Sequence, residues 1–261
     1  MKSCKDKDTV SLVVTSCNRH DLLISTLESF ARFNSYPIHQ IIIIEDSDVF
    51  LDKNTIEEVF SKDENDCYSS TEIILLNNEV NIGQIKSIDK AYSYVTGEYI
   101  FHCEDDWKFY KEGFIEPSMQ ILRNNDKVFT VWLRSYDDLN GHSVGKLNKN
   151  NSVAYRKIER MKFWTGFTLN PGLRRTDVCR KFGLYSDVDM LDKSLKGDRG
   201  PSESDLAILY AQDGYFGAVT HDANGYVCHL GEGRHISNAW ENQYIVFCKN
   251  LIRRYINKIR M

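Results

Sequence analysis

The first 110 residues alternate between short apolar runs and amphipathic segments, and this pattern constrains the fold more than any other feature of the sequence. An unbroken run of β-branched, leucine and aromatic residues favours a strand that is buried on both faces. Apolar residues spaced by three and four favour a helix that packs on a sheet. Strands that alternate with helices predict a mostly parallel sheet, with ligands bound beyond the carboxyl ends of the strands. The predicted strands cover residues 9–15, 40–44, 71–76 and the run that begins at Gly97.

A helix is predicted after each of the first three strands. Asn18 is placed to cap the first of these helices, with an acid three residues further on. Asn54 opens a short second helix. The third helix follows Gly83, whose lack of a side chain permits a positive φ or the close approach of a ligand, and it stops at Gly97.

Three consecutive acids, Glu104, Asp105 and Asp106, end the fourth apolar run. Adjacent carboxylates repel one another and resist leaving water, so a partner should compensate them. If the strand stays extended, Glu104 and Asp106 point to one side and Asp105 to the other. Two converging carboxylates suit a divalent cation, which can in turn hold phosphates. The alternative is structural, with Asp105 or Asp106 capping the next helix.

Polar segments at the ends of the other strands should meet this triplet along one edge of the sheet. They are residues 15–19, 45–48 and 81–84.

Composition excludes several classes of protein. A net charge of −4 over 261 residues gives no basic patch for a nucleic-acid partner. Seven scattered cysteines without a C-x-x-C pair fit free thiols in a reducing compartment. No apolar run is long enough for a signal peptide or a membrane span, so a cytoplasmic protein is expected. Residues 241–261 read as a basic amphipathic helix that either packs on the domain or touches the inner face of an anionic membrane.

The second half of the chain has a less regular pattern. A helix is predicted over residues 111–124 and a strand over 127–134, followed by a long polar surface loop over 136–152. An aromatic strand is predicted from residue 163, and it breaks at 170–172. After a polar stretch over 187–201, Ser202 caps a helix with Asp205 at the capping-box position. Two short strands follow at 215–220 and 226–230.

Three segments resemble the nucleotide-sugar half of inverting family 2 glycosyltransferases: SLVVTSCNRHDLLISTLESF, IIIIEDSD and NEVNIGQIKSIDKAYSYVTGEYIFHCEDDW. Their order and spacing match over about the first 110 residues, and a weaker similarity continues in FTLNPGLRR, SESDLAILYAQDGY and YVCHLGEGRH. The resemblance implies an α/β, GT-A (Rossmann-like) fold, in which helices flank a mostly parallel sheet and a smaller subdomain binds the acceptor. It implies a nucleotide-sugar half at 1–110, an acceptor-binding and catalytic half at 111–240, and the basic helix at 241–261.

The activity implied by this resemblance is metal-dependent, inverting transfer of a sugar from a nucleotide-diphosphate donor. A UDP-sugar is favoured as donor, a glycan, a lipid-linked sugar or a protein supplies the acceptor hydroxyl, and polysaccharide biosynthesis is the expected setting. Asp106 and His229 would bind Mn²⁺ or Mg²⁺. The residues implied in donor binding are Thr15, Ser16, Cys17, Arg19, Glu45, Asp46, Gly83, Gln84, Glu104, Asp105 and Arg234.

An inverting transfer needs a general base beside the acceptor hydroxyl. By the same resemblance, Glu203 and Asp205 occupy the place of that acid. Glu203 is the better candidate because Asp205 already has a role as the capping-box acid. The alternative is that both acids serve only the helix amino terminus and its dipole. Trp107 and Trp164 could stack on sugar rings, or belong to the core.

Two other functions stay open on the sequence. A carbohydrate-binding protein could keep this fold and lack turnover. A sugar-phosphate nucleotidyltransferase could share the first strand and helix, although the segment TSCNRHD has no glycine for a phosphate-binding loop. Acceptor selection would reside in residues 136–152 and 187–201.

Overall fold

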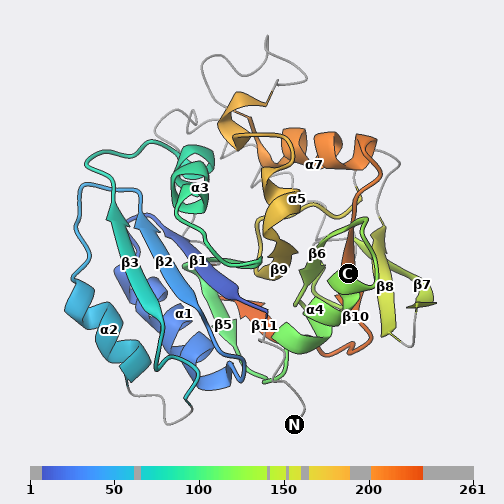
Figure 1. Ribbon diagram of the computed structural model, residues 1–261, viewed down its shortest axis with the longest axis horizontal. Coiled ribbons are helices and arrows are strands. Elements are labelled where there is room, and N and C mark those ends of the chain that lie inside the picture. The colour runs from blue at the N-terminus through green and yellow to red at the C-terminus, as the bar shows by residue number, and fades with distance from the viewer. Residues whose placement is uncertain are drawn as a thin grey trace, which may run out of the picture. The chain divides into compact units, whose positions relative to one another are not determined.

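The computed structural model describes residues 8–61, 66–139, 142–150, 153–159, 165–188 and 201–231. Within these ranges, nine strands form one mixed sheet in the order β3-β2-β1-β4-β9-β6-β10-β8-β7, and β11 pairs with β5 in a small second sheet (Figure 1). The strands are β1 (Val10–Ser16), β2 (Gln40–Glu45), β3 (Glu72–Asn77), β4 (Tyr99–Glu104), β5 (Trp107–Phe109), β6 (Val128–Trp132), β7 (Ser143–Asn150), β8 (Val153–Glu159), β9 (Gly172–Arg175), β10 (Phe216–Thr220) and β11 (Val227–His229).

The first four strands of this sheet, β3-β2-β1-β4, are parallel, as predicted. Their register places Ser16 opposite Glu45 and Thr15 opposite Glu104, so their carboxyl ends lie along one edge. The antiparallel strand β9 lies between β4 and β6 and joins the two halves of the sheet. The α/β fold with a mainly parallel sheet is therefore confirmed.

Helices cover both faces of the sheet, because successive apolar residues of each parallel strand point to opposite faces. Leu12 and Val14 of β1 pack into the core formed with α1, α2 and α4, whereas Val13 packs into the core formed with α3, α5 and α7. The central positions of each parallel strand are therefore mostly apolar on both faces. The helices are α1 (His20–Phe33), α2 (Lys53–Ser61), α3 (Gln84–Ser93), α4 (Ile115–Arg123), α5 (Thr176–Arg180), the 3₁₀ helix η1 (Tyr185–Asp187) and α7 (Glu203–Gln212).

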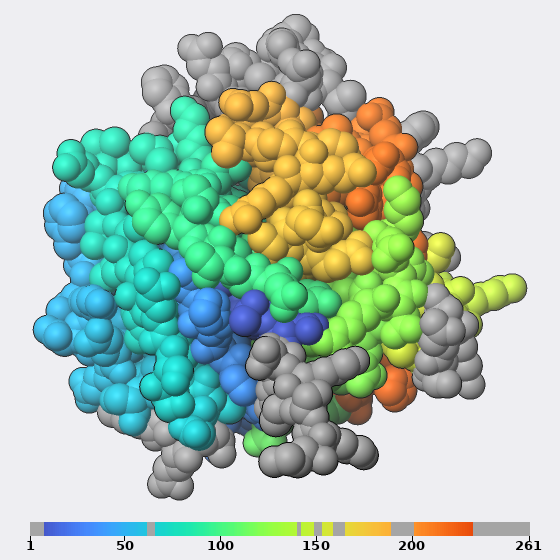
Figure 2. All heavy atoms as spheres, viewed as in Figure 1, coloured from blue at the N-terminus to red at the C-terminus, as the bar shows by residue number. Residues whose placement is uncertain are grey.

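The segment that contains α5 and η1 packs on α3, where Figure 2 shows the gold surface of residues 165–188 lying against green surface from the first half. The Asp89 carboxylate accepts hydrogen bonds from the backbone amides of Tyr185 and Ser186, each at 2.8 Å. Arg180 Nη2 donates to the carbonyl of Val95 at 2.7 Å. The segment with α5 and η1 is thus hydrogen-bonded to α3 and to Val95, which follows α3 and precedes the acidic triplet.

Three local predictions were wrong. Asn18 does not cap the first helix: it has φ +51°, and α1 has Arg19 at its N-cap position without a side-chain capping bond. The long loop predicted over 136–152 contains β7, which pairs with β8 in a hairpin at the edge of the sheet. The polar residues of this hairpin gave no strand pattern in the sequence. The strand predicted from residue 163 is absent from the described residues 165–171, and a strand begins at Gly172, after Pro171, which has no amide donor for a ladder.

Gly172 is required where β9 enters the sheet. A Cβ atom at this position would lie 2.6 Å from the carbonyl oxygen of Val131 and 2.7 Å from Thr130 Oγ1. Only glycine allows β9 to approach β6 this closely. Phe167 therefore precedes the strand and does not form part of it.

The described residues up to Leu230 form one compact unit. None of the helices within the described ranges is long and apolar enough to cross a bilayer. The predicted basic helix at 241–261 lies outside the described residues.

Candidate active site

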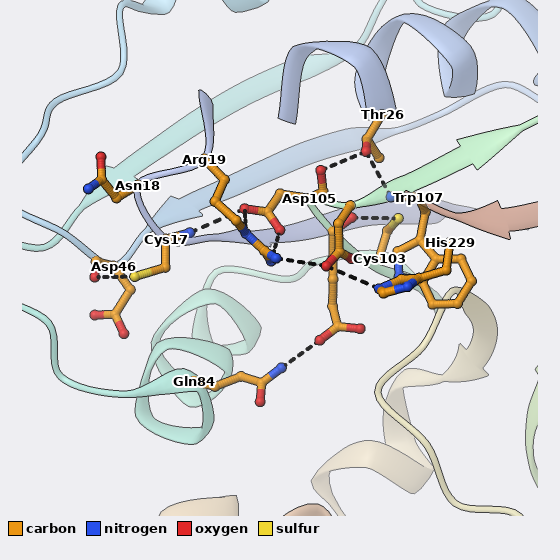
Figure 3. A network of polar contacts seen from close by, with 12 residues as sticks. Cys17, Asn18, Arg19, Thr26, Asp46, Gln84, Cys103, Asp105, Trp107 and His229 are labelled. Atoms are coloured by element: carbon orange, nitrogen blue, oxygen red, sulfur yellow. Dashed lines mark hydrogen bonds and ion pairs between the residues drawn. The ribbon is translucent and has the colours of Figure 1, made fainter. Parts of the chain in front are cut away.

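The acidic triplet forms a turn held by Arg19. β4 ends at Glu104, and Asp105 and Asp106 turn the chain into β5. Arg19 Nε donates to Asp105 Oδ2 at 3.1 Å, and its Nη1 donates to Asp106 Oδ2 at 2.8 Å (Figure 3). The expectation that Asp105 points away from Asp106 was wrong, because the strand does not continue beyond Glu104 and one guanidinium binds both aspartates.

Two hydroxyls of α1 bind the turn and the strand β5 that follows it. Thr26 Oγ1 donates to the carbonyl of Asp105 at 2.8 Å and accepts from the amide of Trp107 at 3.1 Å (Figure 3). One turn later, Ser29 Oγ accepts from the amide of Phe109 at 3.0 Å. Sequence reasoning missed both residues, and the signal that could have revealed them is a pair of hydroxyls at i and i+3 beside the apolar face of a helix.

The site concentrates negative charge. Burial, then the charges of Asp106, Glu203 and Asp105, raise the pKa of Glu104 to about 8. Burial raises the pKa of Asp105 to about 6 although Arg19 opposes the rise. Burial also acts on Asp106, but hydrogen bonds and charges from His229 and Arg19 outweigh it and lower its pKa.

His229 lies beside Asp106 because β11 pairs with β5 and places His229 opposite Trp107. Its Nε2 atom is 3.2 Å from Asp106 Oδ2, and the amide of Leu230 donates to the carbonyl of Asp106 at 2.7 Å. Asp106 Oδ1 is buried and has no hydrogen-bond partner among the described residues. The two predicted metal ligands thus come together from segments far apart in the sequence.

Asp46 shapes the loop before α3. Its carboxylate accepts from the amides of Ile82 and Gly83 at 2.8 and 2.9 Å and from Asn78 Nδ2 at 2.9 Å. Gly83 has φ +91°, a conformation that favours glycine. Asn78, which sequence reasoning missed, is therefore part of the support of this loop.

The other predicted donor-binding residues line the same edge. Gln84 Nε2 donates to Glu104 Oε1 at 2.7 Å, and Glu45 Oε1 accepts from the amide of Asn18 at 2.7 Å. The amide of Cys17 donates to Asp105 Oδ2 at 3.4 Å. The buried Oγ atom of Ser16 has no hydrogen-bond partner within the described ranges. Thr15 is buried at the end of β1.

Glu203 brings the second half of the chain to this edge. It is the first residue of α7, and its Oε1 accepts from the amide of Leu169 at 3.1 Å. Burial raises its pKa, although hydrogen bonds from Thr168 and Leu169 lower it. Its charge in turn raises the pKa of Glu104, so the two carboxyl groups lie close enough to interact electrostatically. Thr168 and Leu169 carry no sequence signal for this role.

Asp205 has the structural role that was predicted for it. Its Oδ2 accepts from the amide and the hydroxyl of Ser202 at 2.8 and 2.7 Å, and the two residues form a capping box. Trp107 is buried, with its ring centroid 5.0 Å from that of His229, and it belongs to the core. Arg234 and Trp164 lie outside the described residues. In the part of the chain that the structure describes, no three His, Cys, Asp or Glu residues cluster as a complete metal site.

Several solved structures share this fold at low sequence identity. The mannosyltransferase PcManGT from Pyrobaculum calidifontis, in complex with GDP-Man and Mn²⁺, has a TM-score of 0.56 and 12% identity over 84% of this chain and 56% of that chain. GalNAc-T7 with UDP, GalNAc and Mn²⁺ has a TM-score of 0.54 and 14% identity over 86% and 44%. S. aureus TarS 1-349 in complex with UDP has a TM-score of 0.51 and 16% identity over 84% and 59%. The chain thus spans between 44% and 59% of these structures.

A comparison with curated proteins finds no match. The family model of glycosyl transferase family 2 matches residues 11–177, which is more than half of the chain and includes the acidic turn, the Asp46 loop and β9. The chain therefore belongs to glycosyl transferase family 2 and has the GT-A fold of these structures.

Proposed function

We propose that this glycosyltransferase moves a sugar from a nucleotide-diphosphate donor, with a UDP-sugar favoured, to an acceptor hydroxyl with inversion at the anomeric carbon. The observation that carries the proposal is the acidic turn at 104–106, where Arg19 binds Asp105 and Asp106 and His229 Nε2 lies 3.2 Å from Asp106 Oδ2. The charge of Glu203, at the start of α7, acts on Glu104 of the same turn. The UDP in the TarS and GalNAc-T7 complexes and the GDP-Man in the PcManGT complex support a nucleotide-sugar donor.

The residues at the turn fit a divalent cation such as Mn²⁺ or Mg²⁺. Asp106 offers one buried oxygen without a hydrogen-bond partner among the described residues, and its other oxygen lies 3.2 Å from the imidazole Nε2 of His229. Ions that bind diphosphates commonly take one or two protein ligands and complete their shell with phosphate oxygens and water. When bound, the cation supplies positive charge for the leaving diphosphate. Mn²⁺ in the PcManGT and GalNAc-T7 complexes supports this assignment.

We assign nucleotide binding to the ends of β1 and β2 and to the loop before α3. Ser16 contributes a hydroxyl that has no partner in the described part of the chain, and Gln84 lies within hydrogen-bond distance of Glu104. Asp46 keeps the Gly83 loop in place through three accepted hydrogen bonds and so acts on the nucleotide in part through that loop. Arg19 holds Asp105 and Asp106 in position.

Glu203 is the proposed general base. As the acceptor oxygen attacks the anomeric carbon, the bond from that carbon to the diphosphate oxygen breaks, and Glu203 takes the proton of the acceptor hydroxyl. Because burial raises its pKa, the carboxylate is a stronger base than an exposed glutamate. Asp205 stabilises the start of α7 and thereby the position of Glu203. The acceptor is a hydroxyl of a glycan, a lipid-linked sugar or a protein.

The first experiment is a calorimetric titration of UDP, GDP and dTDP into the protein with and without Mn²⁺. We expect one nucleotide to bind, UDP by preference, and its affinity to depend on the metal. Asp106→Ala should abolish the metal-dependent part, whereas Asp126→Ala, at a side chain that is 95% exposed, should leave it unchanged. Binding that ignores both the metal and Asp106, or no nucleotide binding at all, would refute the proposed donor site.

A further inference from the structure

Arg174 is a charged residue at the centre of the sheet. It is 0% exposed, and its position in β9 places it opposite Ile100 of β4 and Thr130 of β6. Its guanidinium carbon lies 5.3 Å from the centre of the Phe129 ring. Across the described ranges, no carboxylate lies within ion-pair distance of Arg174. A buried charge without such a partner is costly, so another role must account for its presence.

The hydrogen bonds of Arg174 go to the segment that holds Glu203. Its Nη2 donates to the carbonyls of Thr168 and Asn170, at 2.5 and 3.5 Å. These two carbonyls stand on either side of Leu169, whose amide donates to Glu203 Oε1 at 3.1 Å. One guanidinium nitrogen thus binds the Thr168 carbonyl, which shares a peptide unit with the Leu169 amide that holds Glu203, and the Asn170 carbonyl that follows.

The opposite end of the guanidinium reaches the donor half of the chain. Arg174 Nη1 donates to the hydroxyl of Tyr92 in α3 at 3.0 Å. That hydroxyl lies 3.1 Å from Nδ1 of His102, which is buried in β4 two residues before Glu104. Arg174 therefore connects the Glu203 segment with the strand that carries the acidic turn.

We propose that Arg174 is a positioning residue for Glu203: it clamps residues 168–170 so that the Leu169 amide and the Thr168 hydroxyl hold the carboxylate toward the acceptor hydroxyl. This inference rests on the proposed role of Glu203 as general base. The clamp works through the backbone, so Arg174 needs no contact with either substrate.

The charge of Arg174 supports the same role. Burial raises the pKa of Glu203, and the positive charge of Arg174 opposes that rise. Arg174 also acts on the pKa of buried neighbours that burial keeps uncharged near neutral pH. These neighbours are Tyr92, His102, Cys179, Tyr185 and Tyr210, whereas Glu203 is a carboxylic acid.

The test compares Arg174→Met, which removes the charge and the donors, with Arg174→Lys, which keeps only the charge. Arg175→Met is a matched control, because Arg175 is the next residue of the same strand and binds the carbonyl of Leu122 at 3.2 Å, away from the Glu203 segment. Two quantities are measured on the full chain: release of nucleoside diphosphate from UDP-glucose, UDP-GlcNAc and GDP-mannose over a range of pH, and the titration of Glu203 by NMR with ¹³C-labelled glutamate, assigned with Glu203→Gln.

We expect Arg174→Met to lower kcat at pH 7 by about 10- to 100-fold, part of the usual contribution of a general base, with KM for the donor changed less than about twofold. The midpoint of the Glu203 titration should rise by about one pH unit or more, so the variant should regain rate as the pH increases. Arg174→Lys should keep a midpoint near that of the unmodified protein and lose at least about fivefold in kcat. Arg175→Met should change neither quantity.

The inference is overturned if Arg174→Met folds and binds UDP while both kcat and the Glu203 midpoint stay unchanged, or if Arg175→Met has the same effect. If Arg174→Met does not fold, Arg174→Lys decides, and an unchanged kcat refutes the clamp. If the unmodified protein releases nucleotide from none of the donors, the proposed function fails. The NMR titration still tests the link between Arg174 and Glu203 in that case.

Discussion

Thr26→Val should both destabilise the protein and weaken metal-dependent nucleotide binding. The side chain of Thr26 is 1% exposed, and its hydroxyl satisfies the carbonyl of Asp105 and the amide of Trp107 at once. Valine has nearly the same shape and neither donates nor accepts. The substitution therefore removes both hydrogen bonds that fix the acidic turn to α1 without opening a large cavity.

The magnitude follows from the two backbone groups that lose their partner. Asp105 is 0% and Trp107 is 1% exposed, so water cannot replace the hydroxyl. Each buried group left unpaired costs about 1–3 kcal/mol, so the two together give a loss of about 2–6 kcal/mol in the free energy of unfolding. Thr26→Ser keeps the hydroxyl and loses one buried methyl group, so it should cost about 1 kcal/mol. Ser29→Ala leaves only the amide of Phe109 unpaired and should cost about 1–2 kcal/mol.

The assay combines urea denaturation with the calorimetric titration of UDP and Mn²⁺. Thr26→Val should lose most of its metal-dependent affinity, because Asp106 directly follows the residue whose carbonyl is released. Ser29→Ala, which acts at the far end of β5, should retain that affinity. The reasoning is refuted if Thr26→Val is no more destabilising than Thr26→Ser. It is also refuted if Thr26→Val loses the expected stability and binds the nucleotide as Ser29→Ala does.

Three further predictions concern Asp46, Ser202 and Glu203. Asp46→Asn places an amide donor against the backbone amide of Gly83. Calorimetry should therefore show weaker nucleotide binding, and urea denaturation should show that the free energy of unfolding falls by about 2 kcal/mol. An unchanged free energy of unfolding would contradict this prediction. Ser202→Ala removes the capping box with Asp205 and should lower the free energy of unfolding by about 1 kcal/mol without changing nucleotide affinity. Glu203 must be ionised to act as a base, and burial raises its pKa. The rate should therefore fall on acidification with a midpoint above the ordinary glutamate pKa of about 4.3. A midpoint at or below that value would contradict the role of Glu203 as base.

The parts of the fold that were predicted correctly depend on short stretches of sequence. The parallel strands of the first half are continuous apolar runs, which only a sheet covered on both faces accommodates. The capping box of Ser202 and Asp205 involves residues three apart and was correctly predicted for the same reason. The β7 and β8 hairpin was missed because its polar residues on an exposed edge resemble those of a loop.

The part of the candidate site that could be predicted is the part formed by the carboxyl ends of adjacent parallel strands. Acids at the ends of parallel strands must meet at one edge, so the grouping of Glu45, Asp46 and the acidic turn followed from the strand pattern. The contacts of Arg19 with that turn cross 86 and 87 residues of sequence, and no local pattern indicates them. Those of Thr26 with the same turn cross 79 and 81 residues.

In the second half of the site, the sequence indicates the acid Glu203 but does not indicate the residues that hold it in place. Glu203 stands at a recognisable helix start, yet its orientation depends on residues 168–170, which have no periodicity and lie before a four-residue strand. That strand is antiparallel and fits between β4 and β6 only because Gly172 has no Cβ. The same insertion buries Arg174 between the Glu203 segment and Tyr92. The placement of the proposed base is therefore a consequence of how β9 enters the sheet, so substitutions at Gly172 should impair Glu203 as strongly as substitutions at Arg174.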